Sequence, residues 1–240
     1  MTTEPPARSR VSVIIPVFER LDYLGDALAS IAAQSVRVAE VIVVTDGDRV
    51  DPADAIAATG VAATVVSRTR GGPGAARNTG CDAATGDVFA FLDVDDVWLP
   101  RKLERQLAAL HGGAGVDVVF GGVEHFFSPE LGIPGVPERL ARAERSGLLP
   151  SAMIVRAGTF ARVGGFREGV IFGEFLDWYA RATDMGLRAA TVDEVVVRRR
   201  VHDHNAGVEF RESRGDYARV IKDVLDRRRA AVQLSNAKPS

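Results

Sequence analysis

Apolar positions in the first hundred residues alternate between short continuous runs and runs with helical spacing. The continuous runs predict buried strands at 11–17, 38–44, 62–66 and 88–92. Between them, helical spacing predicts helices at about 21–33, 52–58 and 75–84. This alternation of strand and helix predicts a parallel sheet with helices on its faces, the arrangement of an α/β fold.

The second half of the chain has a less regular pattern. Helices are predicted over 100–110, 172–185 and 216–232, and strands over 116–120, 151–155 and 192–201. Residues 128–150 contain four prolines and several glycines, which predicts a loop or a mobile flap.

Composition narrows the class of protein. The chain has 240 residues, of which 46% are hydrophobic, enough for one domain with a sizeable core. A net charge of -2 gives no basic field, so nucleic acid is not an expected partner. Cys81 is the single cysteine, which excludes an internal disulfide and agrees with a cytoplasmic location. Residues 1–10 lack an apolar signal core and are predicted to be a disordered tail. No apolar run approaches the roughly 20 residues of a membrane span.

An apolar strand runs directly into three carboxylates, those of Asp93, Asp95 and Asp96. Crowded carboxylates raise one another's pKa, and a divalent cation such as Mg²⁺ or Mn²⁺ would relieve the repulsion. We expect Asp95 to be the metal ligand and Asp96 to cap the following helix. Asp46 ends the second predicted strand. Ligands of parallel sheets bind at the carboxyl ends of the strands, so both acidic turns are predicted to face one crevice.

Three further segments carry candidate ligand contacts. Small residues at 74–80 would let a helix start pack closely under an anion. Within them, Arg77 would donate a forked hydrogen bond to a phosphate or a base carbonyl, or pair with a nearby acid. Asp46 would accept a hydrogen bond from a nucleobase or serve the turn chemistry of an Asp-Gly pair. At the end of the first strand, backbone groups of Pro16 and Val17 would contact a planar base. Glu19 would line the same site or simply be a polar residue at the start of the next helix.

Four segments together resemble the family 2 glycosyltransferases: VSVIIPVF at 11–18, EVIVVTDGD at 40–48, GPGAARNTG at 72–80 and FLDVDDVWLP at 91–100. The resemblance covers about residues 10–205. It implies the GT-A fold, with a Rossmann-like, mostly parallel central sheet flanked by helices and a C-terminal acceptor-side subregion. On this basis residues 11–110 are the nucleotide-sugar-binding half, 111–210 the acceptor-side half of the same domain, and 211–240 a C-terminal helix and tail.

The resemblance also implies a metal-dependent, inverting transfer of a sugar from a nucleoside diphosphate sugar, expected to be UDP-linked. Mn²⁺ or Mg²⁺ would bridge the two phosphates. The donor-binding residues would be Pro16, Val17, Glu19, Asp46, Arg77, Asp93 and Val94, with Asp93 on the ribose side. Asp95 would bind the metal, and His202 would join it, because RRRVHDHN at 198–205 resembles an Arg-x-His-x-x-Asn ending in which the histidine reaches the metal or the diphosphate.

The general base is less clearly marked. The segment VGGFRE at 163–168 resembles a stretch beneath the acceptor site, and a Glu-Asp pair usually follows. Aligning Arg181 with the family's arginine places Phe175 where the aspartate is expected. Asp177 and Arg181 stand four residues apart on one helix face and can pair. We therefore expect Glu174 to take the acceptor proton, with Asp177 as the second candidate.

Two other functions remain open at this point. Phe175 is compatible with a non-catalytic nucleotide-sugar-binding protein. A nucleotidyltransferase is disfavoured, because PVFER at 16–20 is not a glycine-rich, lysine-bearing phosphate loop. The acceptor is undefined and ranges over a saccharide, a lipid carrier, a peptide and a small natural product. Glu19 and the TDGD turn at 45–48 depart from the family's pattern and leave the nucleobase open. Arg227–Arg229 are expected to be solvated or to contact a membrane surface or a partner.

Overall fold

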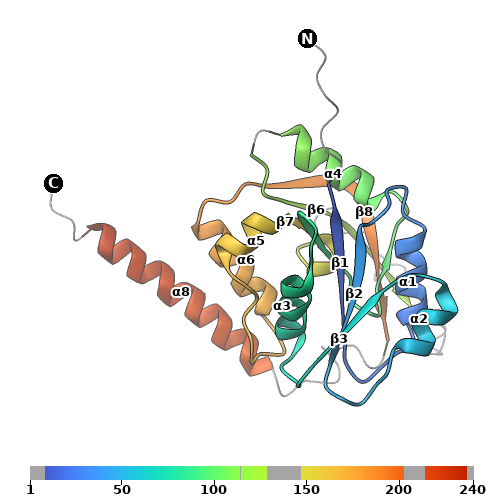
Figure 1. Ribbon diagram of the computed structural model, residues 1–240. Helices are drawn as coiled ribbons and strands as arrows, with labels where there is room; N and C mark the ends of the chain where they lie inside the picture. Colours follow the sequence, from blue (N-terminus) through green and yellow to red (C-terminus); the bar gives the residue numbers. More distant parts are fainter. Residues whose placement is uncertain (1–8, 114, 129–146, 203–213, 237–240) are drawn as a thin grey trace, which may run out of the picture.

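A mixed sheet forms the centre of the computed structural model, and its eight strands in the described residues follow the order β3-β2-β1-β4-β7-β6-β8-β5 (Figure 1). The structure describes residues 9–113, 115–128, 147–202 and 214–236. Most of the predicted tail at 1–10 and of the predicted flap at 128–150 therefore lies outside the described residues, as does His204.

The first half of the chain builds the parallel part of the sheet. Its strands are β1 (Val11–Val17), β2 (Glu40–Asp46), β3 (Thr64–Arg68) and β4 (Val88–Phe91). The helices between them are α1 (Leu24–Ala32), α2 (Ala53–Thr59) and α3 (Pro73–Ala83). Ile14 of β1 lies opposite Ile42 on one side and Phe91 on the other. The predicted elements are confirmed in type and order, although β2 and β3 each begin two residues later than expected.

The second half adds mostly antiparallel pairings. Its elements are β5 (Val97–Trp98), α4 (Lys102–Gly112), β6 (Val118–Phe127), the 3₁₀ turn η3 (Pro150–Ala152), β7 (Ile154–Arg156), α5 (Ala157–Val163), α6 (Glu174–Asp184), β8 (Ala189–Val201) and α8 (Arg214–Asn236). β7 lies antiparallel between β4 and β6, whereas β8 runs parallel to β6. Neither β5 nor α5 was predicted, and β6 continues past its predicted end at Phe120 through an irregularity at Gly122.

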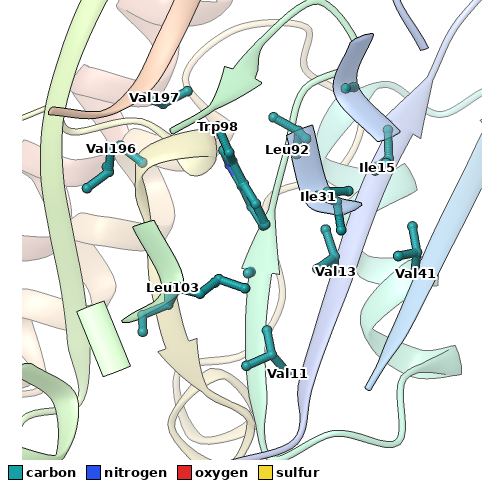
Figure 2. Packing of buried hydrophobic residues seen from close by; sticks show 14 of the residues in the cluster. Val11, Val13, Ile15, Ile31, Val41, Leu92, Trp98, Leu103, Val196 and Val197 are labelled. Carbon is teal, nitrogen blue, oxygen red and sulfur yellow. The ribbon is translucent and has the colours of Figure 1, made fainter. Parts of the chain in front are cut away.

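Alternate positions of β1 contribute to two apolar layers, one on each face of the sheet. Val13 and Ile15 face the layer covered by α1, α2 and α4, where Ile31 and Trp98 complete the packing (Figure 2). Ile14 faces the other layer, which is covered by α3, α5 and α6 and is rich in aromatic rings. Burial on both faces explains why the first strand is a continuous apolar run.

Two glycines let α3 lie directly on its neighbours. A Cβ at Gly80 would collide with the Ile14 side chain, and one at Gly74 would lie 2.5 Å from the carbonyl oxygen of Arg167. The small residues at 74–80 therefore serve close helix packing, and this packing brings Arg77 to the carboxyl end of the sheet. Across the described residues, no helix has the length and apolarity required to cross a membrane.

Candidate active site

A cavity of about 330 Å³ opens at the carboxyl ends of β1, β2 and β4, within the size range of small-ligand sites. Ten of the eleven site residues predicted from the sequence line it: Pro16, Val17, Glu19, Asp46, Arg77, Asp93, Val94, Asp95, Glu174 and His202. The prediction that the two acidic turns face one crevice is confirmed. Asp177 is the exception among the eleven, because the described lining of the cavity does not include it.

Arg77 joins the two halves of the cavity. One terminal nitrogen donates a hydrogen bond to Asp93 Oδ1 over 2.5 Å, and the other donates to Glu174 Oε1 over 2.8 Å. The arginine is only 3% exposed. Burial alone would lower the pKa of Arg77, but Asp93 and Glu174 outweigh it and raise the pKa. Of the alternatives drawn from the sequence, the structure shows the pairing of Arg77 with nearby acids.

Helix α6 begins at Glu174 and points three neighbouring side chains in different directions. Glu174 lines the cavity, and no other described residue hydrogen-bonds its Oε2. Phe175 packs instead against Tyr179 and Phe120 in the aromatic layer. Asp177 is 5% exposed and pairs with Arg181 over 2.8 Å and with Arg227 over 3.0 Å. The predicted pairing of Asp177 with Arg181 is thus confirmed. Glu174 also has a partner, because Arg77 donates a hydrogen bond to its Oε1.

Asp95 and His202 meet in the lining of the same cavity. His202 Nε2 lies 3.0 Å from Asp95 Oδ2, although the two residues are 107 positions apart in the chain. The imidazole ring also packs on Tyr23, with 5.1 Å between the ring centroids. A carboxylate oxygen and an imidazole nitrogen are ligand types that suit a divalent ion such as Mn²⁺.

Asp96 does not cap the next helix, so that prediction is wrong. Helix α4 begins at Lys102 with Arg101 at its N-cap, whereas Asp96 is 2% exposed beneath the acidic turn. Its Oδ1 accepts a long hydrogen bond of 3.4 Å from the backbone N–H of Arg200. Burial raises the pKa of Asp96 well above its usual range, and Asp95 and Asp93 raise it further.

Charge in the cavity favours a bound cation. Its described lining contains six carboxylates, namely Glu19, Asp46, Asp93, Asp95, Asp96 and Glu174, and four arginines, namely Arg20, Arg70, Arg77 and Arg199. Nowhere in the described parts of the chain do three or more metal-ligating side chains cluster as a complete metal site. The pair Asp95 and His202 fits a metal whose remaining ligands come from a bound phosphate, as is usual for Mg²⁺ sites with few protein ligands.

Asp46 holds the loop in front of α3. Its carboxylate accepts hydrogen bonds of 2.8 Å from the backbone N–H groups of Gly71 and Gly72 and from Arg68. These partners lie 22 to 26 residues further along the chain, so they are not the local Asp-Gly turn contacts expected from the sequence. At the neighbouring strand end, Glu19 has a left-handed φ of 56° and pairs with Arg49 over 2.5 Å. A strained backbone of this kind is often found at functional sites.

Two arginines that are not among the predicted site residues, Arg70 and Arg199, also line the cavity. Arg70 lies over the Phe18 ring, with its guanidinium carbon 4.5 Å from the ring centroid. Arg199 is exposed, and its side chain makes no hydrogen bond or ion pair with any other described residue. Alternation along β8 could have identified Arg199, because its neighbours Arg198 and Arg200 face the other side of the strand.

Known sequences that are similar to this chain are glycosyltransferases. Residues 12–163 match the sequence model of the family described as "Glycosyl transferase family 2". An uncharacterized glycosyltransferase of Rickettsia typhi is 29% identical over 209 residues, which cover 80% of this chain and 64% of that relative. The chain therefore spans less than two thirds of the length of this curated relative.

Solved structures share the fold. The Staphylococcus aureus protein TarS in complex with UDP-GlcNAc superposes with a TM-score of 0.71 at 21% identity, over 96% of this chain and 68% of that one. Glucosyl-3-phosphoglycerate synthase of Mycobacterium tuberculosis, in complex with Mn²⁺, UDP and glucosyl-3-phosphoglycerate, gives a TM-score of 0.64 at 18% identity, over 90% and 80% of the two chains. These neighbours are glycosyltransferases of the GT-A fold, and the predicted fold class is thereby confirmed.

Proposed function

The chain belongs to glycosyltransferase family 2, and from this premise we propose that it catalyses a metal-dependent, inverting transfer of a sugar from a nucleoside diphosphate sugar. The proposed donor is UDP-linked and the proposed acceptor group is a hydroxyl or another nucleophile. One observation carries the proposal. A single cavity contains the pair Asp95 and His202 and, bridged to Asp93 through Arg77, the carboxylate of Glu174.

We assign the donor to the side of the cavity formed by the strand ends. Pro16 and Val17 lie there with Asp46, the proposed base contact, whose Oδ2 accepts one hydrogen bond in the described structure and has room for another. Asp93 and Val94 would meet the ribose. In TarS and in the mycobacterial synthase the bound nucleotide is a uridine diphosphate, which supports UDP as the first donor to test.

Asp95 and His202 are the proposed metal ligands. A divalent ion bound there would neutralise charge on the diphosphate leaving group. The acid excess of the lining supports this assignment, because an anionic donor would otherwise enter a cavity that repels it. Arg199, which has no partner among the described residues, would supply a second positive charge at the same end.

Glu174 is the proposed general base. Arg77 fixes Oε1, and Oε2 remains available to accept a proton from the acceptor. The acceptor oxygen then bonds to the anomeric carbon from the face opposite the diphosphate, as the bond from that carbon to the phosphate oxygen breaks. The proton stays on Glu174 and the diphosphate leaves with the electron pair, so the anomeric configuration inverts. Asp177 is less suited to this role, because two arginines hold it away from the cavity.

A donor screen tests the proposal. The protein is incubated with UDP- and GDP-linked sugars in Mn²⁺, in Mg²⁺ or in EDTA, and thermal stabilisation and release of nucleoside diphosphate are both measured. We expect at least one donor to stabilise the protein and to release its diphosphate only when the metal is present. Asp95→Asn should abolish the metal response, whereas Asp193→Asn, an exposed acid outside the cavity lining, should preserve it.

Four results would contradict the proposal. Turnover that is unchanged in EDTA would show that the transfer needs no metal. If NMR shows that the product keeps the donor's anomeric configuration, the inverting displacement is excluded. Donor binding without turnover for any acceptor would favour the non-catalytic binding protein instead, and pyrophosphate release would favour a nucleotidyltransferase.

A further inference from the structure

The C-terminal helix α8 exposes an apolar stripe that the rest of the described protein does not cover. Tyr217, Ile221 and Leu225 are 48%, 38% and 46% exposed. Residues four apart on a helix are rotated by only about 40°, so the three side chains lie along one side of α8. Figure 1 shows α8 at the outer edge of the molecule, with its C-terminal end directed away from the sheet.

A different side of α8 already attaches the helix to the protein. Val220 and Val224 are buried against Val170 and Ala180, in a small cluster of their own. Ion pairs reinforce this contact, with Arg227 on Asp177, Arg228 on Asp184 and Asp223 on Arg167. The exposed stripe is therefore not needed to hold the helix in place, and the apolar side of α8 is wider than the surface that covers it.

Charges on α8 are sorted around this stripe. By the same rotation of about 100° per residue, Arg228 projects within the stripe, where it already pairs with Asp184 of α6. Arg229 and Lys222 project along the outer border of the stripe. The acids Asp216, Asp223 and Asp226 lie on the opposite side of the helix. The side chains of Lys222 and Arg229 are 75% and 74% exposed, and their ion pairs are with Asp226 of the same helix. The border of the stripe therefore has two cations that share one carboxylate, that of Asp226.

We propose that this side of α8 docks on the surface of an anionic phospholipid bilayer. Three apolar side chains would enter the headgroup boundary, and the flanking cations would pair with lipid phosphates, as in interfacial amphipathic helices. The charge pattern argues against a second copy of the chain as the occupant. Two copies joined through this stripe would bring four of these cations together, and the two Asp226 carboxylates that already pair with them would leave an excess of positive charge.

Vesicle flotation of the full chain, with no donor or metal added, tests the proposal independently of the proposed function. We expect binding to vesicles of phosphatidylcholine mixed with phosphatidylglycerol, weaker binding in high salt, and little binding to phosphatidylcholine alone. The double variant Lys222→Gln/Arg229→Gln should lower the partition coefficient by about 30-fold, at the usual contribution of one basic residue near an anionic surface. Its matched control is Arg101→Gln/Arg105→Gln, which removes the same charge from exposed positions of α4.

A second pair of variants separates the apolar contribution from the charges. Ile221→Ser/Leu225→Ser should abolish flotation, whereas Val65→Ser, at a residue of similar exposure on β3, should leave it unchanged. Equal binding to neutral and anionic vesicles, or flotation of both α8 variants like the parent, would overturn the proposal. So would a lipid-independent dimer that dissociates in Ile221→Ser/Leu225→Ser, because the second copy would then be the occupant.

Discussion

Replacement of Arg77 by methionine tests whether one buried side chain organises the catalytic cavity. Arg77 is 3% exposed and pairs with Asp93 on one side and with Glu174 on the other. Methionine approximates the volume of the aliphatic part but removes the charge and both hydrogen bonds. Glu174, whose side chain is 10% exposed, would then be a buried carboxylate without its cation.

The expected loss of stability follows from this burial. Removal of one partner of a buried ion pair costs about 3–5 kcal/mol. The Asp93 side chain is 33% exposed and would regain water, so Glu174 carries most of the penalty. We therefore expect the lower end of that range, about 3 kcal/mol, which for a protein of this size lowers the melting temperature by about 6–12 °C.

Urea unfolding of four variants, Arg77→Met, Glu174→Gln, their combination and Arg77→Lys, gives the measurement. Arg77→Met/Glu174→Gln removes the orphaned charge together with its partner and should be more stable than the sum of the two single changes predicts, by about 1–2 kcal/mol. Arg77→Lys keeps a charge but lacks the fixed fork whose two ends donate to Asp93 and to Glu174, so its stability should be intermediate. A loss below about 1 kcal/mol in Arg77→Met, or strict additivity in the double variant, would refute the reasoning.

Three further predictions concern other residues. Burial lowers the pKa of Lys102 well below its usual value, so above the folded pKa the unfolded chain binds a proton that the folded protein does not. The free energy of unfolding should therefore rise with pH up to about 10.5. Lys102→Met should flatten this slope in urea titrations, and an unchanged slope would contradict the prediction. Glu19→Asn should raise the free energy of unfolding by about 0.5–1 kcal/mol, because asparagine tolerates the left-handed φ better. A lower free energy of unfolding in chemical denaturation would contradict the claim that the backbone at Glu19 is strained. Arg199→Gln should weaken nucleoside diphosphate binding by about tenfold in calorimetry. Arg198→Gln should not weaken it, because the Arg198 side chain pairs with Glu124. Equal effects of the two variants would contradict the assignment of Arg199 to the diphosphate.

The strands of the first half were predictable because each carries its own signal. Val11–Val17 is apolar at nearly every position, since both faces of β1 are covered, and its predicted bounds are those of the structure. By contrast, α5 spans seven residues with a glycine near its start, too short for a helical period to emerge. The extension of β6 beyond Phe120 depends on an irregular register at Gly122, where the sequence suggests an end.

The residues of the site were predictable as a set, but their pairings were not. Acidic turns at strand ends imply a common crevice, because parallel strands share one carboxyl edge. The bond from Arg77 to Glu174 joins residues 97 positions apart, and it depends on how α3 and α6 pack. Asp96 shows the same limit. Its place before a helix suggested a cap, yet the tertiary fold buries it beneath the turn.

Glu174 is proposed to take the acceptor proton, because Phe175 occupies the position where an aspartate base was expected. Single-turnover transfer should be measured in Glu174→Gln and in Asp177→Asn, with the donor dissociation constant determined for each. The account predicts that Glu174→Gln lowers the rate by about 10²- to 10⁴-fold with donor affinity nearly unchanged, and that folded Asp177→Asn keeps most of its rate. Full transfer by Glu174→Gln, or a comparable loss in Asp177→Asn alone, would contradict it.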